Sequence, residues 1–346
     1  MKRILSAITI TLASLGFNIP LAAQDAPLRV AVSTPDLKSL AERLGGEHVR
    51  VFSLTKGPED PHVVELLPSF VRELQQAELF IQVGLGLENA WLEDLLTRAG
   101  NDRVKPGGPA NLNLGTGVRR LADDEGADAV PGSFHEEGNP HYLLDPVEGL
   151  KAARLICDKL VELRPAGKAA FDELHAQFVR AWAVAYLGEA ITARAEVAKL
   201  EDFASGDVLE AYLTELTRNA RPTDGVAGLL APFKGLVIVG DHDLWPYFAR
   251  RYGLEVLGYL EPSPGVPPTT RHLGELIGKM KEAQVRVILT APYFDQRHGR
   301  FVSERTGAKV VPMVHQCGGR PGTDDYLDMV KFNATRLATA LKEGAR

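Results

Sequence analysis

Apolar and polar positions alternate along the first part of the chain in a pattern typical of α/β proteins. Short apolar runs at 29–33, 49–55 and 78–84 predict strands. Amphipathic segments at 34–46 and 68–77 predict the helices between them. Strands that alternate with helices at this spacing indicate a largely parallel sheet covered by helices.

The period changes to that of long helices beyond Pro146. Apolar residues on one helical face predict a first helix that ends near residue 163. A second helix is expected to begin at Pro165 and to run to about Leu200, with Phe171 in its apolar stripe. A helix of this length spans roughly 50 Å, which suits a rigid connection between two lobes.

Strand-like runs resume after this helix. They are GLVIVGD, LEVLGYL, VRVILTAP and AKVVPMV, at 235–241, 254–260, 285–292 and 308–314. We therefore predict an α/β fold of two lobes, each with a mainly parallel sheet flanked by helices, joined by one long rigid helix. The expected boundaries are 24–163 for the N-terminal lobe, 164–200 for the linking helix and 201–346 for the C-terminal lobe.

The first residues have the pattern of a secretory signal peptide. Lys2 and Arg3 precede an apolar run, and the small residues Ala22 and Ala23 precede a polar stretch. The alternative is a membrane anchor, but the run is marginal in length for a spanning helix and is broken near its end. We predict a signal peptide over 1–23 and a periplasmic protein.

Composition narrows the classes of function. The chain has 346 residues, of which 45% are hydrophobic, and this is enough for two cores. Its formal net charge is −6 and it has no block rich in lysine and arginine, which argues against a nucleic-acid-binding protein. Its two cysteines cannot form a disulfide scaffold, so the fold depends on apolar burial.

Four histidines stand at the ends or beginnings of predicted elements. His62 and His141 each follow a proline, in DPH and NPH, and His242 and His315 lie just beyond predicted strands. Ligands of open parallel sheets bind outside the carboxyl ends of the strands, so these side chains can converge between the lobes. Neutral imidazoles are typical zinc ligands. The alternative is that each is a surface or capping histidine, and the long separations match no short metal motif.

Two carboxylates lie close in sequence to these histidines. Asp60 precedes His62 by two residues, and Asp241 directly precedes His242. Carboxylates of this kind accept the second ring N–H of a metal ligand and fix its tautomer. The alternative is that they cap helices. His272, on an amphipathic segment, is interpreted as structural or solvated.

Several blocks together resemble the TroA-like substrate-binding proteins of ABC importers for zinc and manganese. These blocks are DPHVVELLPS, NPHYLLDP and HDLWPYFARRYGLEVLGYLEPSPGVPPT. The resemblance implies two lobes with a metal between them, held by His62, His141 and His242. The fourth ligand of the family is usually an aspartate, and His315 lies at or next to that position; water or a nearby carboxylate are alternatives. An all-imidazole trio favours Zn²⁺ over Mn²⁺.

The resemblance also implies partners and a role. It implies a monomer without enzymatic activity that delivers Zn²⁺ to an ABC permease and its ATPase. Zinc members commonly carry a histidine-rich loop before the second ligand, whereas this chain has acidic residues at 123–128 and then His135, Glu136 and Glu137. That loop is interpreted as a weak metal-recruiting segment or simply a solvated one. The segment 200–232 is longer than the family requires.

Three other functions are considered. The same class of protein could carry manganese or iron. Three histidines and an open position on zinc would also suit an exported hydrolase, although the sequence shows neither a general base nor a substrate pocket. An adhesin or chaperone role is the third alternative.

Overall fold

The computed structural model describes residues 26–121, 138–206, 208–218, 224–262 and 266–343. The predicted signal peptide at 1–23 and the segment with His135, Glu136 and Glu137 lie outside these described residues. Across the described ranges, no helix is both long and apolar enough to cross a membrane.

The first lobe is a four-stranded parallel sheet in the order β2-β1-β3-β4. The strands are β1 (Leu28–Val32), β2 (Val49–Ser53), β3 (Leu79–Gln82) and β4 (Asn111–Asn113). The helices α1 (Pro35–Gly45), α2 (Pro68–Gln76) and α3 (Leu92–Ala99) connect them. Phe80 of β3 packs into a cluster with α2 and α3, and its neighbour Ile81 packs into the larger core beside α1. Burial on both faces explains the continuous apolar runs of these strands.

The second lobe repeats this topology with the strand order β6-β5-β7-β8, again parallel. The strands are β5 (Val237–Gly240), β6 (Glu255–Tyr259), β7 (Val287–Thr290) and β8 (Lys309–Pro312). The helices are α11 (Pro246–Tyr252), α12 (Thr270–Glu282), α13 (Gln296–Thr306) and the C-terminal α14 (Tyr326–Glu343). In each lobe the first strand lies between the second and the third, so the predicted alternation is confirmed as two parallel sheets.

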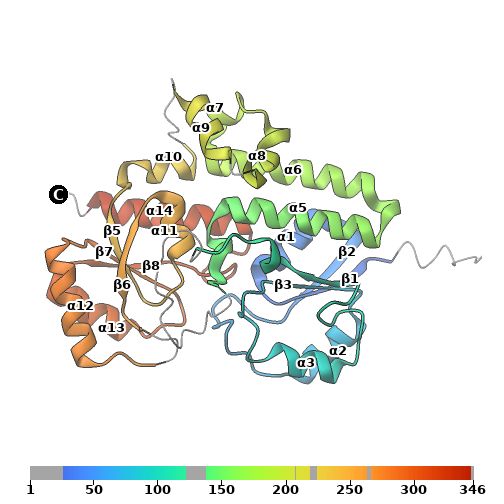
Figure 1. Cartoon of the computed structure of the whole chain (residues 1–346), viewed down its shortest axis with the longest axis horizontal. Coiled ribbons are helices and arrows are strands. Elements are labelled where there is room, and N and C mark those ends of the chain that lie inside the picture. The colour runs from blue at the N-terminus through green and yellow to red at the C-terminus, as the bar shows by residue number, and fades with distance from the viewer. Residues whose placement is uncertain (1–25, 122–137, 207, 219–223, 263–265, 344–346) are drawn as a thin grey trace, which may run out of the picture.

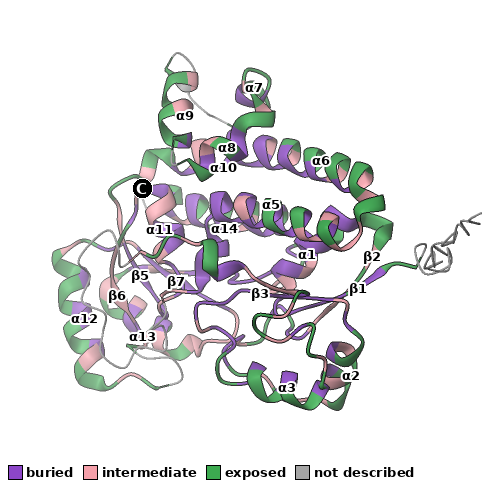
Figure 2. Ribbon diagram, turned by 45° about the vertical axis from the view of Figure 1, so that its right-hand side comes forward, coloured by how far each residue is buried: buried purple, intermediate pink, exposed green. Residues whose placement is uncertain are grey.

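Long helices run along the backs of both sheets and join the lobes. They are α5 (Pro146–Leu163) and α6 (Lys168–Leu187), with α14 alongside (Figure 1). One large buried cluster includes residues of both lobes, and the indole of Trp182 on α6 donates to the carbonyl of Pro146, 2.7 Å away. The core is therefore continuous between the lobes. Figure 2 colours the buried residues of the long helices and of the strands purple.

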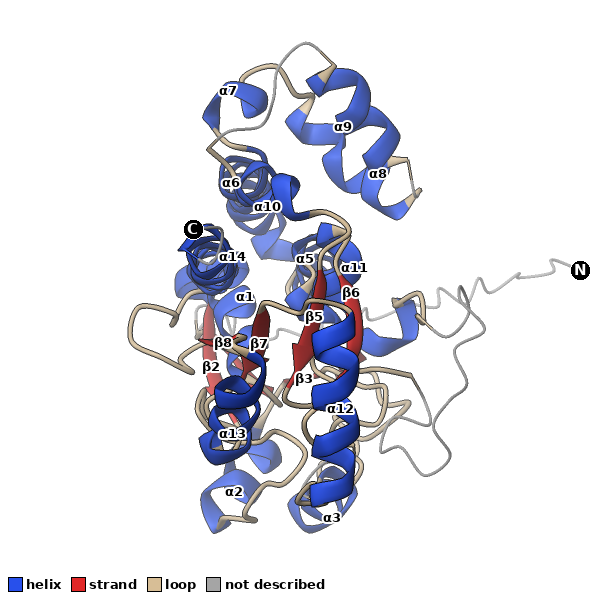
Figure 3. Cartoon of the chain, turned by 90° about the vertical axis from the view of Figure 1, so that its left-hand side faces the viewer, coloured by secondary structure: helices blue, strands red, loops and turns tan. Residues whose placement is uncertain are grey.

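The linking helix is shorter than the sequence predicted. It ends at Leu187 rather than near 200, because Gly188 turns the chain with a φ of +85° that favours glycine. Short helices follow: α7 (Glu189–Thr192), α8 (Leu200–Ser205), α9 (Leu209–Thr217) and α10 (Val226–Leu230). In Figure 3 α7 and α9 lie above α6, and α8 and α10 lie beside it.

The buried Glu201 side chain holds this helical segment against the long helices. Glu201 of α8 lies 2.7 Å from the ring Nε2 of His175 on α6 and also 2.7 Å from a guanidinium nitrogen of Arg154 on α5. Removal of either partner leaves a buried carboxylate less well compensated, so the three residues fix α8 to both helices.

Candidate metal site between the lobes

The loop after β2 carries His62 and orients its ring. Asp60 accepts the backbone N–H of His62 at 3.0 Å, and an oxygen of the same carboxyl lies 2.8 Å from the ring Nδ1. The indole of Trp91 donates to the carbonyl of Pro61 at 3.0 Å and fixes the backbone between them. Burial raises the pKa of Asp60, but its bonds with His62 outweigh this and lower that pKa below its ordinary value. An ionised Asp60 therefore accepts from Nδ1, and Nε2 lies on the far side of the ring.

His141 opens a short 3-10 turn (His141–Leu144) immediately before α5. Its backbone N–H donates to the side chain of Asn139 at 2.9 Å. The amide of Asn139 in turn donates to the backbone carbonyl of Asp243, in the second lobe, at 2.8 Å. The turn that presents His141 is thus held by a contact between the lobes.

His242 follows the end of β5, and Asp241 shapes the backbone that carries it. The Asp241 carboxyl accepts the backbone N–H of His242 at 2.8 Å, the indole of Trp245 at 2.9 Å and the backbone N–H of Ala291. Burial raises the pKa of Asp241 to about 7, although these donors lower it. These bonds hold the backbone that carries His242, and the contact of Asp241 with the His242 ring stays a prediction.

His315 lies beyond β8 and reaches across to the first lobe. Its Nε2 lies 3.0 Å from the carbonyl of Glu59, and its ring packs edge-on against Tyr293. Burial lowers the pKa of His315 to about 4, while the Glu59 carbonyl raises it. A neutral ring that donates from Nε2 leaves a lone pair on Nδ1, and this buried atom has no hydrogen-bond partner among the described residues. Its chemistry suits a metal ligand.

The predicted histidines come together from both lobes. The ring centroid of His62 lies 5.2 Å from that of His141 and 6.2 Å from that of His242. Two imidazoles on one tetrahedral zinc ion have centroids about 5 Å apart, so the first pair fits and the second would have to approach slightly. Among the described residues, no three His, Cys, Asp or Glu side chains already stand in a metal-binding arrangement. The imidazoles of His62, His141 and His242 are thus close together, but their side chains do not yet have the arrangement of a bound-metal site.

A small cavity lies beside His141 and His315. It has a volume of about 20 Å³, enough for roughly one water-sized species. Asp36 also lines it; its carboxyl accepts the backbone N–H of Cys317 at 2.8 Å, and burial raises its pKa to about 6. Sequence analysis does not identify Asp36 or Tyr293. Asp36 lies in the first turn of α1, where acidic residues are common, and Tyr293 lies in a loop without a recognisable motif.

Comparisons with known proteins agree with this architecture. Residues 30–206 and 207–340 match the family described as zinc-uptake complex component A, periplasmic (ZnuA). The chain is 25% identical over 332 residues to the manganese-binding lipoprotein MntA of Bacillus subtilis, covering 92% of this chain and 91% of the relative. It is 22% identical over 327 residues to the manganese ABC transporter substrate-binding lipoprotein PsaA of Streptococcus anginosus, covering 91% and 90%.

The fold is shared with solved structures. A crystal structure of ZnuA superimposes with a TM-score of 0.62 at 24% sequence identity, covering 91% of this chain and 99% of that one. The predicted two-lobed fold is therefore confirmed.

Proposed function

The chain belongs to the periplasmic zinc-uptake component A family, and from that premise we propose that it captures Zn²⁺ in the periplasm and delivers it to an ABC importer. It is a metal-binding, substrate-binding component of such an importer, and the metal is its cargo. Its partners are then a permease and an ATPase, and we propose that it acts as a monomer without catalytic activity.

The observation that carries this proposal is the approach of His62 to histidines of both lobes, at 5.2 Å from His141 and 6.2 Å from His242. A cation bound there joins the lobes, and His315 completes the set through Nδ1. Asp60 keeps the His62 ring in one orientation. We propose these four histidines as the ligands, with Asp60 and Asp241 as the groups that position them.

Zinc is favoured by the chemistry of the donors. Imidazole nitrogen suits Zn²⁺, whereas Mn²⁺ prefers carboxylate and other oxygen ligands. The burial that keeps His315 neutral above pH 4 is consistent with a nitrogen donor at neutral pH. Manganese is the second candidate, because the two relatives named above are manganese-binding proteins.

The test is isothermal titration of the metal-free protein with Zn²⁺ and with Mn²⁺. We expect one zinc ion per chain, large losses of affinity in His62→Ala and His242→Ala, and no loss in His272→Ala. His272 is a matched control, because its ring Nε2 lies 2.9 Å from the carbonyl of Tyr259 at the edge of the second sheet. Equal binding by all three variants contradicts the site, and tighter binding of Mn²⁺ than of Zn²⁺ contradicts the choice of metal.

A further inference from the structure

The side chain of Gln316 joins the loop after β8, in the second lobe, to the loop after β2, in the first. This side chain is buried. Its amide nitrogen lies 2.8 Å from the backbone carbonyl of Lys56, 3.1 Å from that of Glu59 and 3.3 Å from that of Gly57. An amide NH₂ group has two N–H donors and its oxygen has none, so three carbonyls around one end of the side chain identify that end as the nitrogen.

The segment that Gln316 holds leads directly to the first-lobe part of the candidate metal site. Asp60 and His62 follow Glu59 in the chain, and the Asp60 carboxyl orients the His62 ring. On the other loop, the residue before Gln316 is His315, whose Nε2 lies 3.0 Å from the carbonyl of Glu59. Gln316 therefore connects two backbone segments that each carry a proposed ligand.

The two loops also pack backbone against backbone. A methyl group added at Gly57 would clash with the backbone of Cys317 and Gly318, so only glycine allows this approach. The backbone N–H of Cys317 donates to the carboxyl of Asp36, on α1 of the first lobe, at 2.8 Å. Because the contact is this close, a shift of one loop displaces the other.

The amide oxygen of Gln316 shows that core packing alone does not explain this residue. Its Oε1 is buried and has no hydrogen-bond partner among the residues that the structure describes. A buried amide oxygen without a donor costs free energy, and an apolar side chain of the same length would avoid this cost. Gln316 also lines the small cavity beside His141 and His315, so its side chain lies next to the site that it connects.

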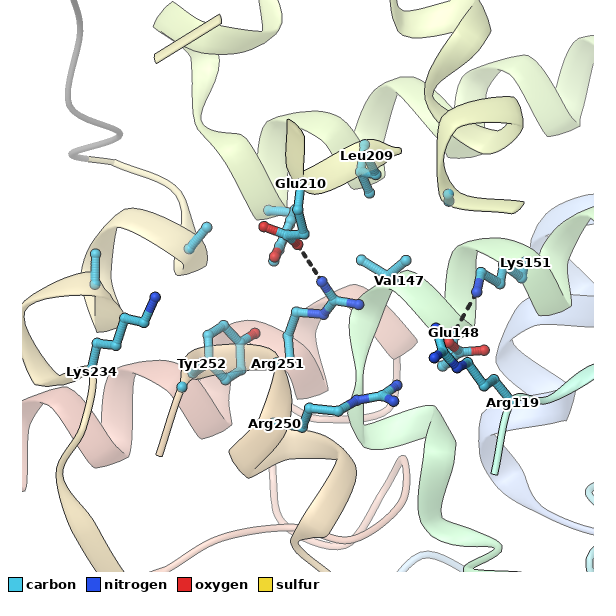
Figure 4. A pocket seen from close by; sticks show the side chains of 15 residues that line it. Arg119, Val147, Glu148, Lys151, Leu209, Glu210, Lys234, Arg250, Arg251 and Tyr252 are labelled. Carbon is cyan, nitrogen blue, oxygen red and sulfur yellow. Dashed lines mark hydrogen bonds and ion pairs between the residues drawn. The ribbon is translucent and has the colours of Figure 1, made fainter. Parts of the chain in front are cut away.

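Contacts between the lobes on the side of the long helices are of a different kind. Arg251 of α11 lies 2.7 Å from a carboxyl oxygen of Asp145, which caps α5, and it also pairs with Glu210 of α9 (Figure 4). Arg251 and Glu210 line a cavity of about 510 Å³ whose wall contains none of the four histidines. Ion pairs thus join the lobes there, whereas the neutral amides of Asn139 and Gln316 join them beside the metal site.

We propose that Gln316 is a positioning residue for zinc capture. In the metal-free protein it holds the segment that carries His62 in register with the segment that carries His315, so that ligands of both lobes are close together before the ion arrives. This inference rests on the proposed function, because it concerns the same site. Ligands that are already in place lose less conformational entropy on binding. Groups that hold metal ligands in place contribute a factor of about 10 to 100 in affinity, and because Gln316 acts through the backbone we expect about tenfold.

The test is competition for Zn²⁺ between a coloured chelator and variants of the whole protein. Gln316→Met keeps the length of the side chain but cannot donate, and it should bind zinc about tenfold more weakly than the wild type. Gly57→Ala separates the same two segments by a backbone clash, should also weaken zinc binding, and replaces Gln316→Met if that variant does not fold. Asn101→Leu is the matched control, because the Asn101 amide nitrogen lies 2.9–3.3 Å from three backbone carbonyls at the end of α2, within the first lobe. It should bind zinc as the wild type does.

Two further measurements separate positioning from a general loss of stability. In the metal-free protein, the backbone amides of 56–62 should exchange their hydrogens faster in Gln316→Met than in the wild type, whereas those of β3 should exchange at the same rate. In a His62→Ala background, Gln316→Met should cause a smaller further loss of zinc affinity than in the wild type, because the ring that it positions is absent.

The proposal is overturned by unchanged zinc affinity in a folded Gln316→Met, or in Gly57→Ala if the first variant does not fold. It is also overturned if Asn101→Leu loses as much affinity as Gln316→Met, or if the amides of 56–62 exchange equally in both proteins. A wild type that does not bind zinc contradicts the proposed function instead. Hydrogen exchange then still tests whether Gln316 holds the two loops together.

Discussion

Replacing Asp60 with asparagine isolates the contribution of one carboxylate to metal capture. In the structure this carboxylate lies 2.8 Å from Nδ1 of His62, and the His62 side chain is only 7% exposed. Asparagine keeps the size of the side chain but removes the charge, and its amide can turn an N–H towards Nδ1. The ring would then lose the partner that fixes its tautomer with Nε2 directed away from Asp60.

The expected loss follows from similar groups around metal ligands. Such partners contribute a factor of about 10 to 100 in metal affinity, which corresponds to about 1.4 to 2.7 kcal/mol of binding free energy. Competition for Zn²⁺ with a coloured chelator at pH 7.5 measures this loss directly. Asp94→Asn is the matched control, because Asp94 pairs with Arg98 on the surface of α3.

Two results would refute this reasoning. If Asp60→Asn binds zinc within twofold of the wild type while His62→Ala binds weakly, the carboxylate does not position the ring. If Asp60→Asn loses as much affinity as His62→Ala, the carboxylate is itself a ligand and the four-histidine set is wrong.

Three further predictions concern stability. Burial lowers the pKa of His315 to about 4, so below about pH 6.5 the unfolded chain takes up a proton on this ring and the folded chain does not. Between pH 6.5 and 4 the metal-free wild type should therefore lose about 3 kcal/mol more of its unfolding free energy than His315→Asn, as measured by urea unfolding. Equal pH dependence of the two proteins would contradict this. Gly188→Ala should lower the unfolding free energy by about 1 to 3 kcal/mol, because φ is +85° and the added methyl group would clash with the carboxylate of Asp224. The control Gly278→Ala, on α12 with open space around it, should leave the stability unchanged or raise it. Equal melting temperatures of the two variants would contradict this prediction. Trp91→Phe should lower the unfolding free energy by about 1 kcal/mol and weaken zinc binding slightly, because the carbonyl of Pro61 loses its hydrogen-bond donor. Unchanged stability and zinc affinity would show that the His62 loop does not need this hydrogen bond.

Much of the fold follows from local pattern. The strands β3 and β7 are buried on every residue, so they appear in the sequence as unbroken apolar runs bounded by helices. The end of α6 could not be found in this way, because helix-forming residues continue beyond Leu187. The chain turns there because Gly188 adopts a positive φ against Asp224, a contact between residues distant in sequence.

The candidate site also has features that local sequence pattern indicates and features that it does not. Prolines before His62 and His141 and a strand end before His242 indicate where these side chains stand, and the structure brings their rings close together. The bond of His315 to the carbonyl of Glu59 joins residues 256 positions apart, and no local pattern indicates it. The contacts of Asp241 with Trp245 and with the backbone of Ala291 could not be predicted for a related reason, because only the folded chain places these groups beside its carboxyl oxygens.

Diffraction from zinc-loaded crystals on both sides of the zinc absorption edge tests the central claim most directly. We expect one anomalous peak between the lobes, about 2.0–2.1 Å from ring nitrogens of His62, His141 and His242, with Nδ1 of His315 as the fourth donor. A peak bound by side chains of one lobe only, or a fully loaded crystal in which these rings do not touch the metal, would contradict the account.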